Sequence, residues 1–195
     1  MADPSYIVDN VLTDGEAWVA LASTTLGSDT AEVTFTSPDD GSSLDWSQFM
    51  DLILILYGRS TESAAASYGR VYLNNDSTGT NFPWQTFYGN GSAATAGTGT
   101  GYGYIQAGYF PAATAGANIF GATVVHLFDI NSGKYKTIVS LSAADTDGSG
   151  HVSLDQTLWK SQAPITEIDI KLNNADNILA ASRFDLFGVL PRMVA

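Results

Sequence analysis

The chain has 195 residues, a length that all-β sandwiches often reach as one undivided domain. Twenty acidic and eight basic residues give a net charge of −12, which argues against nucleic acid as a partner because phosphate binding requires clustered Lys and Arg. The absence of cysteine excludes disulfides and thiolate metal sites. No secretory signal is visible, and the longest apolar run, Leu52 to Tyr57, is far shorter than the roughly 20 residues that cross a membrane.

In chain order, ten short segments rich in Val, Ile, Thr and aromatic residues alternate with polar turns. These segments are Trp18–Thr25, Ala31–Thr36, Leu52–Tyr57, Ser67–Asn74, Tyr102–Gln106, Ala122–Ile130, Lys134–Leu141, Val152–Leu158, Thr166–Leu172 and Ser182–Val189. This pattern, with almost no helical periodicity, is typical of an all-β domain rather than of βαβ units. The one helical turn predicted is Asp45–Met50, with Asp45 as its cap.

Two of the polar turns predict hairpins. Asp129–Lys134 joins two strands through Asn, Ser and Gly, which tolerate the positive φ of hairpin turns. Asp145–Gly150 does the same one strand later. The inner faces of the sandwich are expected to carry Trp18, Phe35, Leu52, Leu54, Leu56, Val71, Val125, Leu127, Ile138, Leu158, Ile168, Ile170, Phe184 and Leu186.

Two stretches poor in large apolar residues are predicted to be long loops. Gly89–Gly103 consists mainly of Gly, Ala, Ser and Thr and buries little apolar surface, so we expect it to be flexible. Ala107–Ala117 has a similar character. No domain boundary is visible, so residues 1–195 are expected to form a single β-sandwich domain with an N-terminal arm at residues 1–15.

The turn that begins at Asp145 resembles a calcium loop. Asp145, Asp147 and Ser149 supply oxygen atoms at its first, third and fifth positions, and Gly150 occupies the sixth. The twelfth position carries Gln156 where a bidentate Glu is required, and the flanks are strand-like rather than helical. We therefore interpret it as a hairpin tip whose three oxygen-bearing side chains are weak metal candidates, with a calcium-stabilised domain as an alternative. No cofactor is expected.

Catalytic residue types are sparse. The two histidines are His126, at a strand position, and His151, beside the acidic turn, and no nucleophile-elbow motif accompanies either. Most aspartates lie at predicted turns, where they ordinarily bond to the local backbone. We predict no catalytic residue and no enzymatic activity. A depolymerase with two carboxylates at glycosidase spacing is the alternative.

Large aromatic residues concentrate around the Gly-rich segment. We predict that they form an interface, because exposed aromatics either anchor a neighbouring subunit or stack on sugar rings. The alternative is a hydrophobic cluster beneath a long loop. The residues are Trp84, Phe87, Tyr88, Tyr102, Tyr104 and Tyr109.

Several strand-and-turn segments resemble one known group of proteins. The segments are Ala31–Ser37, Asp51–Ser60, Gly69–Asp76, Ala117–Gly121, Lys134–Thr137, Leu158–Ile168 and Ala181–Val189. In order and spacing they are similar to the small jelly-roll virion proteins of tailed phages, especially marine and cyanobacterial ones. The chain departs from that group at Ala93–Gly103, which is unusually rich in Gly, Ala and Thr.

The resemblance implies a jelly-roll-like antiparallel β-sandwich of about eight to ten strands with long Gly-rich loops. It also implies a non-enzymatic capsid decoration or cement protein, synthesised in the host cytoplasm and located in the virion. The expected partners are the major capsid protein or other virion proteins, and copies of the chain itself in symmetric homo-oligomers such as trimers. The alternative is a receptor- or glycan-binding module of a head or tail fibre that uses the loop aromatics.

Overall fold

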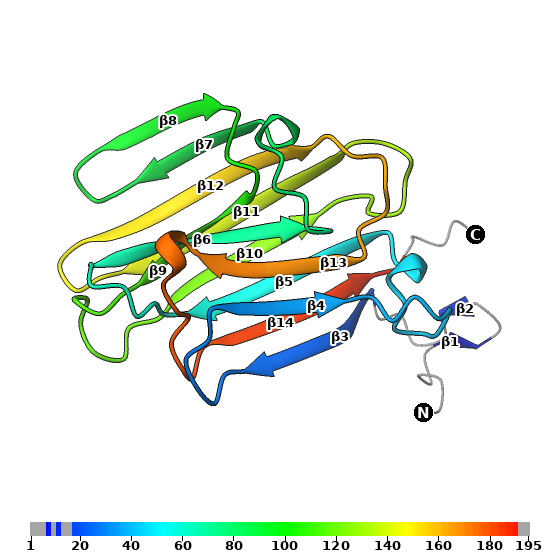
Figure 1. The fold of residues 1–195 in the computed structure, drawn as a ribbon, viewed down its shortest axis with the longest axis horizontal. Coiled ribbons are helices and arrows are strands. Elements are labelled where there is room, and N and C mark those ends of the chain that lie inside the picture. Colours follow the sequence, from blue (N-terminus) through cyan, green and yellow to red (C-terminus); the bar gives the residue numbers. More distant parts are fainter. Residues whose placement is uncertain (1–6, 9–10, 13–16, 191–195) are drawn as a thin grey trace.

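The computed structural model of the protein describes residues 7–8, 11–12 and 17–190, and most of these form two facing antiparallel sheets (Figure 1). The larger sheet has eight strands in the spatial order β3 (Trp18–Thr25), β14 (Arg183–Val189), β5 (Asp51–Gly58), β10 (Gly121–Leu127), β11 (Lys136–Asp145), β12 (Gly150–Trp159), β7 (Trp84–Gly89) and β8 (Ala94–Gly99). The smaller sheet has four, in the order β4 (Glu32–Thr36), β13 (Glu167–Leu172), β6 (Ala66–Leu73) and β9 (Ile105–Pro111).

The remaining elements are short. β1 (Ile7–Val8) pairs with β2 (Val11–Leu12), and the rest of the expected N-terminal arm at residues 1–15 lies outside the described residues. Three 3-10 turns complete the elements: η1 (Trp46–Gln48), η2 (Gly79–Asn81) and η3 (Asn173–Ala175). In the described part of the chain, no helix is long and apolar enough to cross a bilayer.

The strand order is that of a jelly roll with two added hairpins. Without β7–β8 and β11–β12, eight strands remain, four in each sheet, in the orders β3-β14-β5-β10 and β4-β13-β6-β9. Two interleaved Greek keys of this kind define the jelly roll, so the predicted fold class is confirmed. Both added hairpins join the same sheet, which widens it to eight strands while the facing sheet keeps four.

Ten of the strands correspond to the ten segments predicted from the sequence, and both predicted hairpins form, as β10–β11 and β11–β12. Asp45 caps η1 as expected, accepting a bond from the Ser47 N–H at 2.8 Å. The differences lie in the two predicted loops. Gly89–Gly103 contains β8, and Ala107–Ala117 contains five of the seven residues of β9, so the predicted strand Tyr102–Gln106 overlaps β9 only at Ile105 and Gln106. With β7 and β8 added, the sandwich has twelve strands rather than eight to ten.

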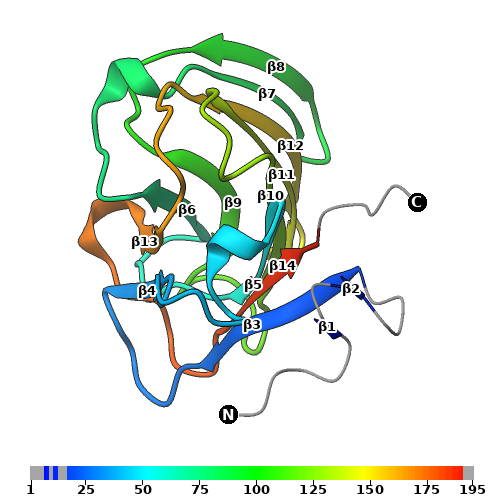
Figure 2. The same ribbon diagram turned by 90° about the vertical axis from the view of Figure 1, so that its right-hand side faces the viewer.

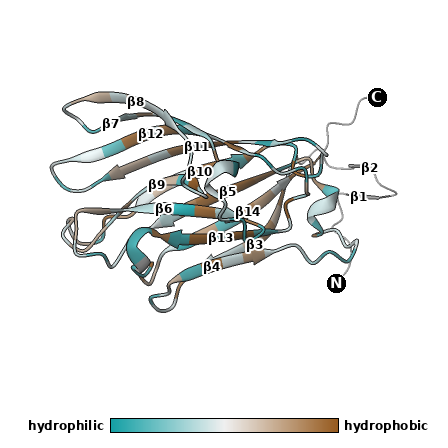
Figure 3. Ribbon diagram, turned by 45° about the horizontal axis from the view of Figure 1, so that its top comes forward, coloured by the Kyte–Doolittle hydropathy of each residue, from teal (hydrophilic) through white to brown (hydrophobic). Residues whose placement is uncertain are grey.

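The core lies where the two sheets face one another, and twelve of the predicted core side chains are buried there. Figure 3 shows the apolar strand β5 at its centre. Two predictions fail, because Trp18 is 49% exposed and Leu158 is only partly buried. Side chains alternate between the two faces of a strand, and the inward positions next to these residues are taken by Val19 and Trp159.

A buried arginine organises the chain after β9. Arg59 follows β5 and is 7% exposed, and its guanidinium donates to four backbone carbonyls of residues 112–119 at 2.7–3.1 Å. A charge this deeply buried requires such partners, because desolvation without them is costly. Arg59 therefore acts as an anchor for the backbone of this irregular segment.

Trp159 is the largest buried side chain, as its position near the end of a predicted strand suggested. It is 2% exposed, and its indole N–H donates to Asp76 Oδ2 at 2.8 Å. We expect Trp159→Ala to lower the free energy of unfolding by about 3–5 kcal/mol, because the change leaves a large cavity. Trp18→Ala is the matched control at an exposed tryptophan, and we expect a loss below about 1 kcal/mol. Urea unfolding measures both; equal losses would contradict the assignment of Trp159 to the core.

Candidate functional site

The structure divides the six predicted interface aromatics between two faces. The inner face of the large sheet is the one turned towards the small sheet, and Trp84 and Tyr88 of β7 lie on it. Phe87 lies between them in sequence and therefore faces outward. The other three residues come from β9 and the segment before it: Tyr102, Tyr104 and Tyr109. Five aromatics thus gather at one end of the sandwich, and Phe87 belongs to a different surface.

Trp84 stands at one end of a stack of three rings, with Tyr102 in the middle. Its ring is nearly parallel to Tyr102, with centroids 4.9 Å apart, and Tyr102 is parallel to Tyr104 at 5.2 Å. On β8, Gly97 and Gly99 lie against the same indole, where a Cβ atom at Gly99 would come within 2.9 Å of it. Gly99, one of the glycines that suggested a flexible loop, is therefore a steric requirement of this strand, because it makes room for Trp84.

A second aromatic group includes a histidine. Tyr109 stacks on His151 with ring centroids 3.9 Å apart, Tyr88 lies 5.7 Å from the same imidazole, and the Tyr109 hydroxyl bonds to that of Tyr68. Burial lowers the pKa of His151 below 6.5, since the charged imidazolium is poorly solvated there. His151 is therefore neutral at pH 7 and serves as a flat ring within the group.

Between the two groups of rings lies a pocket of about 240 Å³, which we call the aromatic pocket. It lies between β9 and the inner faces of β7, β8 and β12. Figure 2 shows how these four strands are arranged. Its aromatic lining residues are Tyr68, Trp84, Tyr88, Tyr102 and Tyr109. Its polar lining residues are Thr86, Thr95, Gln106, Ser153 and Asp155. Four of these five rings are among the aromatic residues predicted to form an interface, whereas none of the polar lining residues was predicted.

Asp155 is the charged group of the aromatic pocket. It is 4% exposed and accepts a hydrogen bond from Ser153 Oγ at 2.7 Å. Burial raises its pKa, and the hydrogen bonds from Thr86 and Ser153 oppose that effect. No basic side chain lines the pocket. The pocket therefore combines apolar ring surfaces with a carboxyl group whose ionisation is not compensated by a positive charge.

The opposite face of the same strands is apolar. Two register rows cross six strands of the large sheet. One row is Ile55, Val124, Leu141, Leu154, Phe87 and Ala96, and the next is Tyr57, Ala122, Ala143, Val152, Gly89 and Ala94. We call these rows the outer apolar face. Five large apolar side chains of this face are 40–59% exposed: Phe87, Val124, Leu141, Val152 and Leu154. No position in either row is charged.

The weak metal candidates form a hairpin tip. Asp145 accepts the Asp147 N–H at 2.7 Å, and the Thr146 hydroxyl bonds to Ser149 Oγ at 2.6 Å. The side chains of Asp145 and Ser149 are thus engaged in bonds within the turn between β11 and β12, and Asp147 is engaged through its backbone N–H. Across the described residues, no group of three or more His, Cys, Asp and Glu side chains has a geometry suited to a metal ion.

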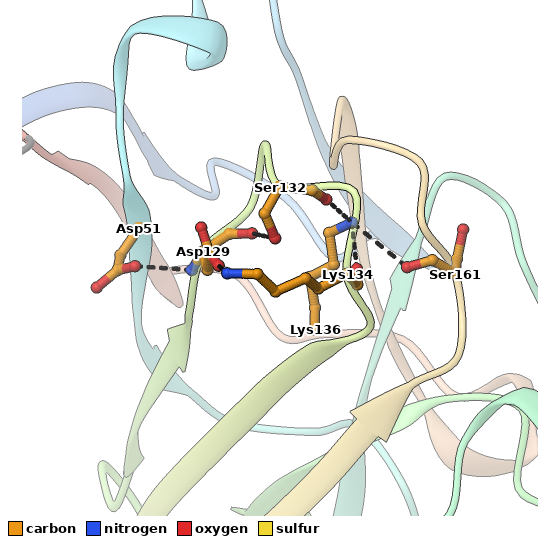
Figure 4. A network of polar contacts seen from close by, with 6 residues as sticks. All are labelled: Asp51, Asp129, Ser132, Lys134, Lys136 and Ser161. Atoms are coloured by element: carbon orange, nitrogen blue, oxygen red, sulfur yellow. Dashed lines mark hydrogen bonds and ion pairs between the residues drawn. The ribbon is translucent and has the colours of Figure 1, made fainter.

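His126 belongs to a structural contact at the other end of the sandwich. Its Nε2 lies 2.9 Å from Asp51 Oδ2, and its ring stacks on Phe128. The other oxygen of Asp51 accepts the Asp129 N–H at 2.8 Å, at the start of the β10–β11 turn (Figure 4). Asp51 therefore ties His126 to this turn, an arrangement that orients the backbone.

The same turn contains a buried lysine. Lys136 Nζ donates to the carbonyls of Ser132, Lys134 and Ser161 at 2.8, 2.9 and 3.3 Å, while Lys134 pairs with Asp129 (Figure 4). Burial lowers the pKa of Lys136. All three ammonium protons are used by carbonyl oxygens, so Lys136 closes the hairpin base and is a poor candidate for a base or nucleophile.

Comparisons with known proteins give no further assignment. No family model, no curated protein and no solved structure matches the chain.

His151 is expected to couple stability to pH. Its lowered pKa means that the unfolded chain binds a proton first as the pH falls, so stability is intact above pH 6.5 and decreases below it. His151→Phe keeps a ring against Tyr109 but has no group that binds a proton. We expect its melting temperature to fall less than that of the wild type when the pH is lowered from about 7.5 to about 5. Thermal unfolding followed by circular dichroism measures this. Equal losses in the two proteins would refute the coupling.

Proposed function

We propose that this protein is a non-enzymatic structural component of a phage particle, a capsid decoration or cement protein that assembles with other copies of itself. The observation that carries the proposal is the outer apolar face. The jelly-roll fold supports it, because viral capsid proteins commonly use this fold. The resemblance of the sequence to virion proteins of tailed phages supports it as well. Other virion proteins, such as the major capsid protein, are the proposed partners in the particle.

The size of the outer apolar face suits the centre of an interface. With about 4.8 Å between strands and about 6.8 Å for every two residues, two rows across six strands cover roughly 29 by 14 Å, or about 400 Å². An interface of standard size buries about 800 Å² on each partner, with an apolar centre and a polar rim. The two rows therefore supply about half of such an interface, and neighbouring polar residues supply its rim.

The charge pattern favours another copy as the occupant. The protein carries a net charge of −12, yet the rows contain no charged side chain across six strands. An apolar surface without charges can pair with the same surface of a second copy across a twofold axis, because the contact then places like residues against like. Burying Leu, Val and Phe side chains against the same residues of a second copy is favourable, because apolar area leaves water on both sides.

The test is the double substitution Leu141→Lys with Leu154→Lys, at two facing positions in the middle row. We expect it to convert the oligomer into a monomer while the melting temperature of the fold stays within a few degrees, because both side chains point away from the core. The control is Thr137→Lys, an exposed position on the same face of β11 outside the two rows. Light scattering coupled to size-exclusion chromatography gives the mass of each protein.

Salt provides a second measurement. Because each copy is strongly acidic, screening of the mutual repulsion should strengthen self-association as the salt concentration rises. A wild-type protein that is monomeric at high salt and at high protein concentration would overturn the proposed contact. So would an oligomer whose mass is unchanged by the double substitution.

A further inference from the structure

We propose that the aromatic pocket binds one pyranose ring of a neutral glycan. The pocket lies on the inner side of β7, whereas Phe87 and the outer apolar face lie on its other side. This binding site is therefore separate from the surface proposed for assembly. The proposal follows from the size of the pocket, from the pairing of rings with polar groups, and from a polar atom that lacks a partner.

The size of the pocket limits its ligand. Sites for drug-sized molecules are about 300–1,000 Å³. The aromatic pocket, at about 240 Å³, suits something smaller, such as a single sugar ring. Its walls are rigid, because Trp84 is held between β8 and Tyr102, and Tyr109 is held against His151. A preformed pocket loses little conformational entropy when a small ligand enters.

The polar atoms indicate a ligand that both donates and accepts hydrogen bonds. Asp155 is an acceptor at the buried side of the pocket. Another lining side chain, Gln106, has a buried nitrogen, Nε2, that lacks a hydrogen-bond partner. Buried donors without partners are costly, so a ligand that supplies acceptors is favoured. A sugar hydroxyl donates to a carboxylate and accepts from an N–H, which satisfies both kinds of atom.

Two other ligand classes fit less well. Phosphate-containing ligands are disfavoured, because the lining residues include one carboxylate and no basic side chain. An alkylammonium ion would suit Asp155 and the aromatic rings. It carries no acceptor for the Nε2 atom of Gln106, however, so it leaves that donor unpaired. A neutral polyhydroxylated ring accounts for both groups, because its hydroxyls donate to Asp155 and accept from Gln106.

The test is saturation-transfer difference NMR on the full chain with neutral methyl pyranosides: the glucoside, galactoside, mannoside and N-acetylglucosaminide. Concentrations on the order of 10 mM reveal dissociation constants in the millimolar range. We expect at least one of them to bind saturably. We expect Gln106→Leu to weaken that binding by about tenfold, because a hydrogen bond is lost and an apolar group replaces it. Gln85→Leu is the matched control, since Gln85 is exposed on the outer face of β7.

Asp155→Asn separates loss of binding from loss of folding. The uncompensated buried carboxylate opposes folding at neutral pH, so we expect the amide to raise the melting temperature while it weakens pyranoside binding. The proposal is overturned if no pyranoside saturates the protein, or if Gln106→Leu and Asp155→Asn bind as the wild type does. Saturable binding of choline chloride without any pyranoside binding would also overturn it, in favour of an ammonium site. None of these outcomes depends on the oligomeric state that tests the assembly proposal.

Discussion

The structure depends on the unequal width of its two sheets. A jelly roll needs four strands on each side, but the hairpins β7–β8 and β11–β12 extend one sheet to eight. The edge strand β9 of the small sheet therefore faces several strands of the large sheet at once. It packs against β10, β11 and β12, and its backbone comes close enough that Thr123 Oγ1 donates to the Ala107 carbonyl at 2.9 Å. A Cβ atom at Gly108 would lie 2.2 Å from Ser142, so this approach requires glycine. Beyond β9 the inner faces of β7 and β8 have no opposing strand, and the aromatic pocket occupies that space.

The close approach of β9 reverses the usual pattern of side chains over the middle of β11 and β12. Inward positions there hold the small polar residues Ser140, Ser142 and Ser153, and Ser142 lies directly against Gly108 of β9. Outward positions hold Leu141 and Leu154, which are exposed and do not pack in the core of the single chain. Steric need accounts for the polar interior, whereas only burial against another surface gives the apolar exterior a stabilising role. This contrast is why the outer face, rather than the aromatic cluster, is the surface proposed for assembly.

The jelly-roll strands were predictable because their signal is strong. β5 is a continuous apolar run and β13 alternates apolar with polar residues, and both patterns are recognised strand signals. The cap and the hairpin turns are local features that short sequence patterns predict. β8 was not predictable, since Ala94–Gly99 has low strand propensity and is defined by the Trp84 ring that lies on its glycines. Leu158 was misplaced because a rule that puts apolar residues inside fails on a strand whose inner face is polar. The polar residues of the pocket come from β7, β9 and β12, and sequence spacing does not bring these strands together.

β7 connects the two proposals physically. Its outward Phe87 belongs to the outer apolar face, and its inward Trp84 and Tyr88 line the pocket. Contact between copies through the outer face therefore leaves the pockets open on the far side of each sheet. A pocket for one sugar ring offers few contacts, so its intrinsic affinity is expected to be weak. Repetition of the pocket on a symmetric particle converts weak single contacts into strong attachment, because each later contact forms at a high effective concentration. The two proposals are thus complementary: they use the two faces of one sheet, and assembly through the outer apolar face would multiply the weak binding of glycan in the aromatic pocket.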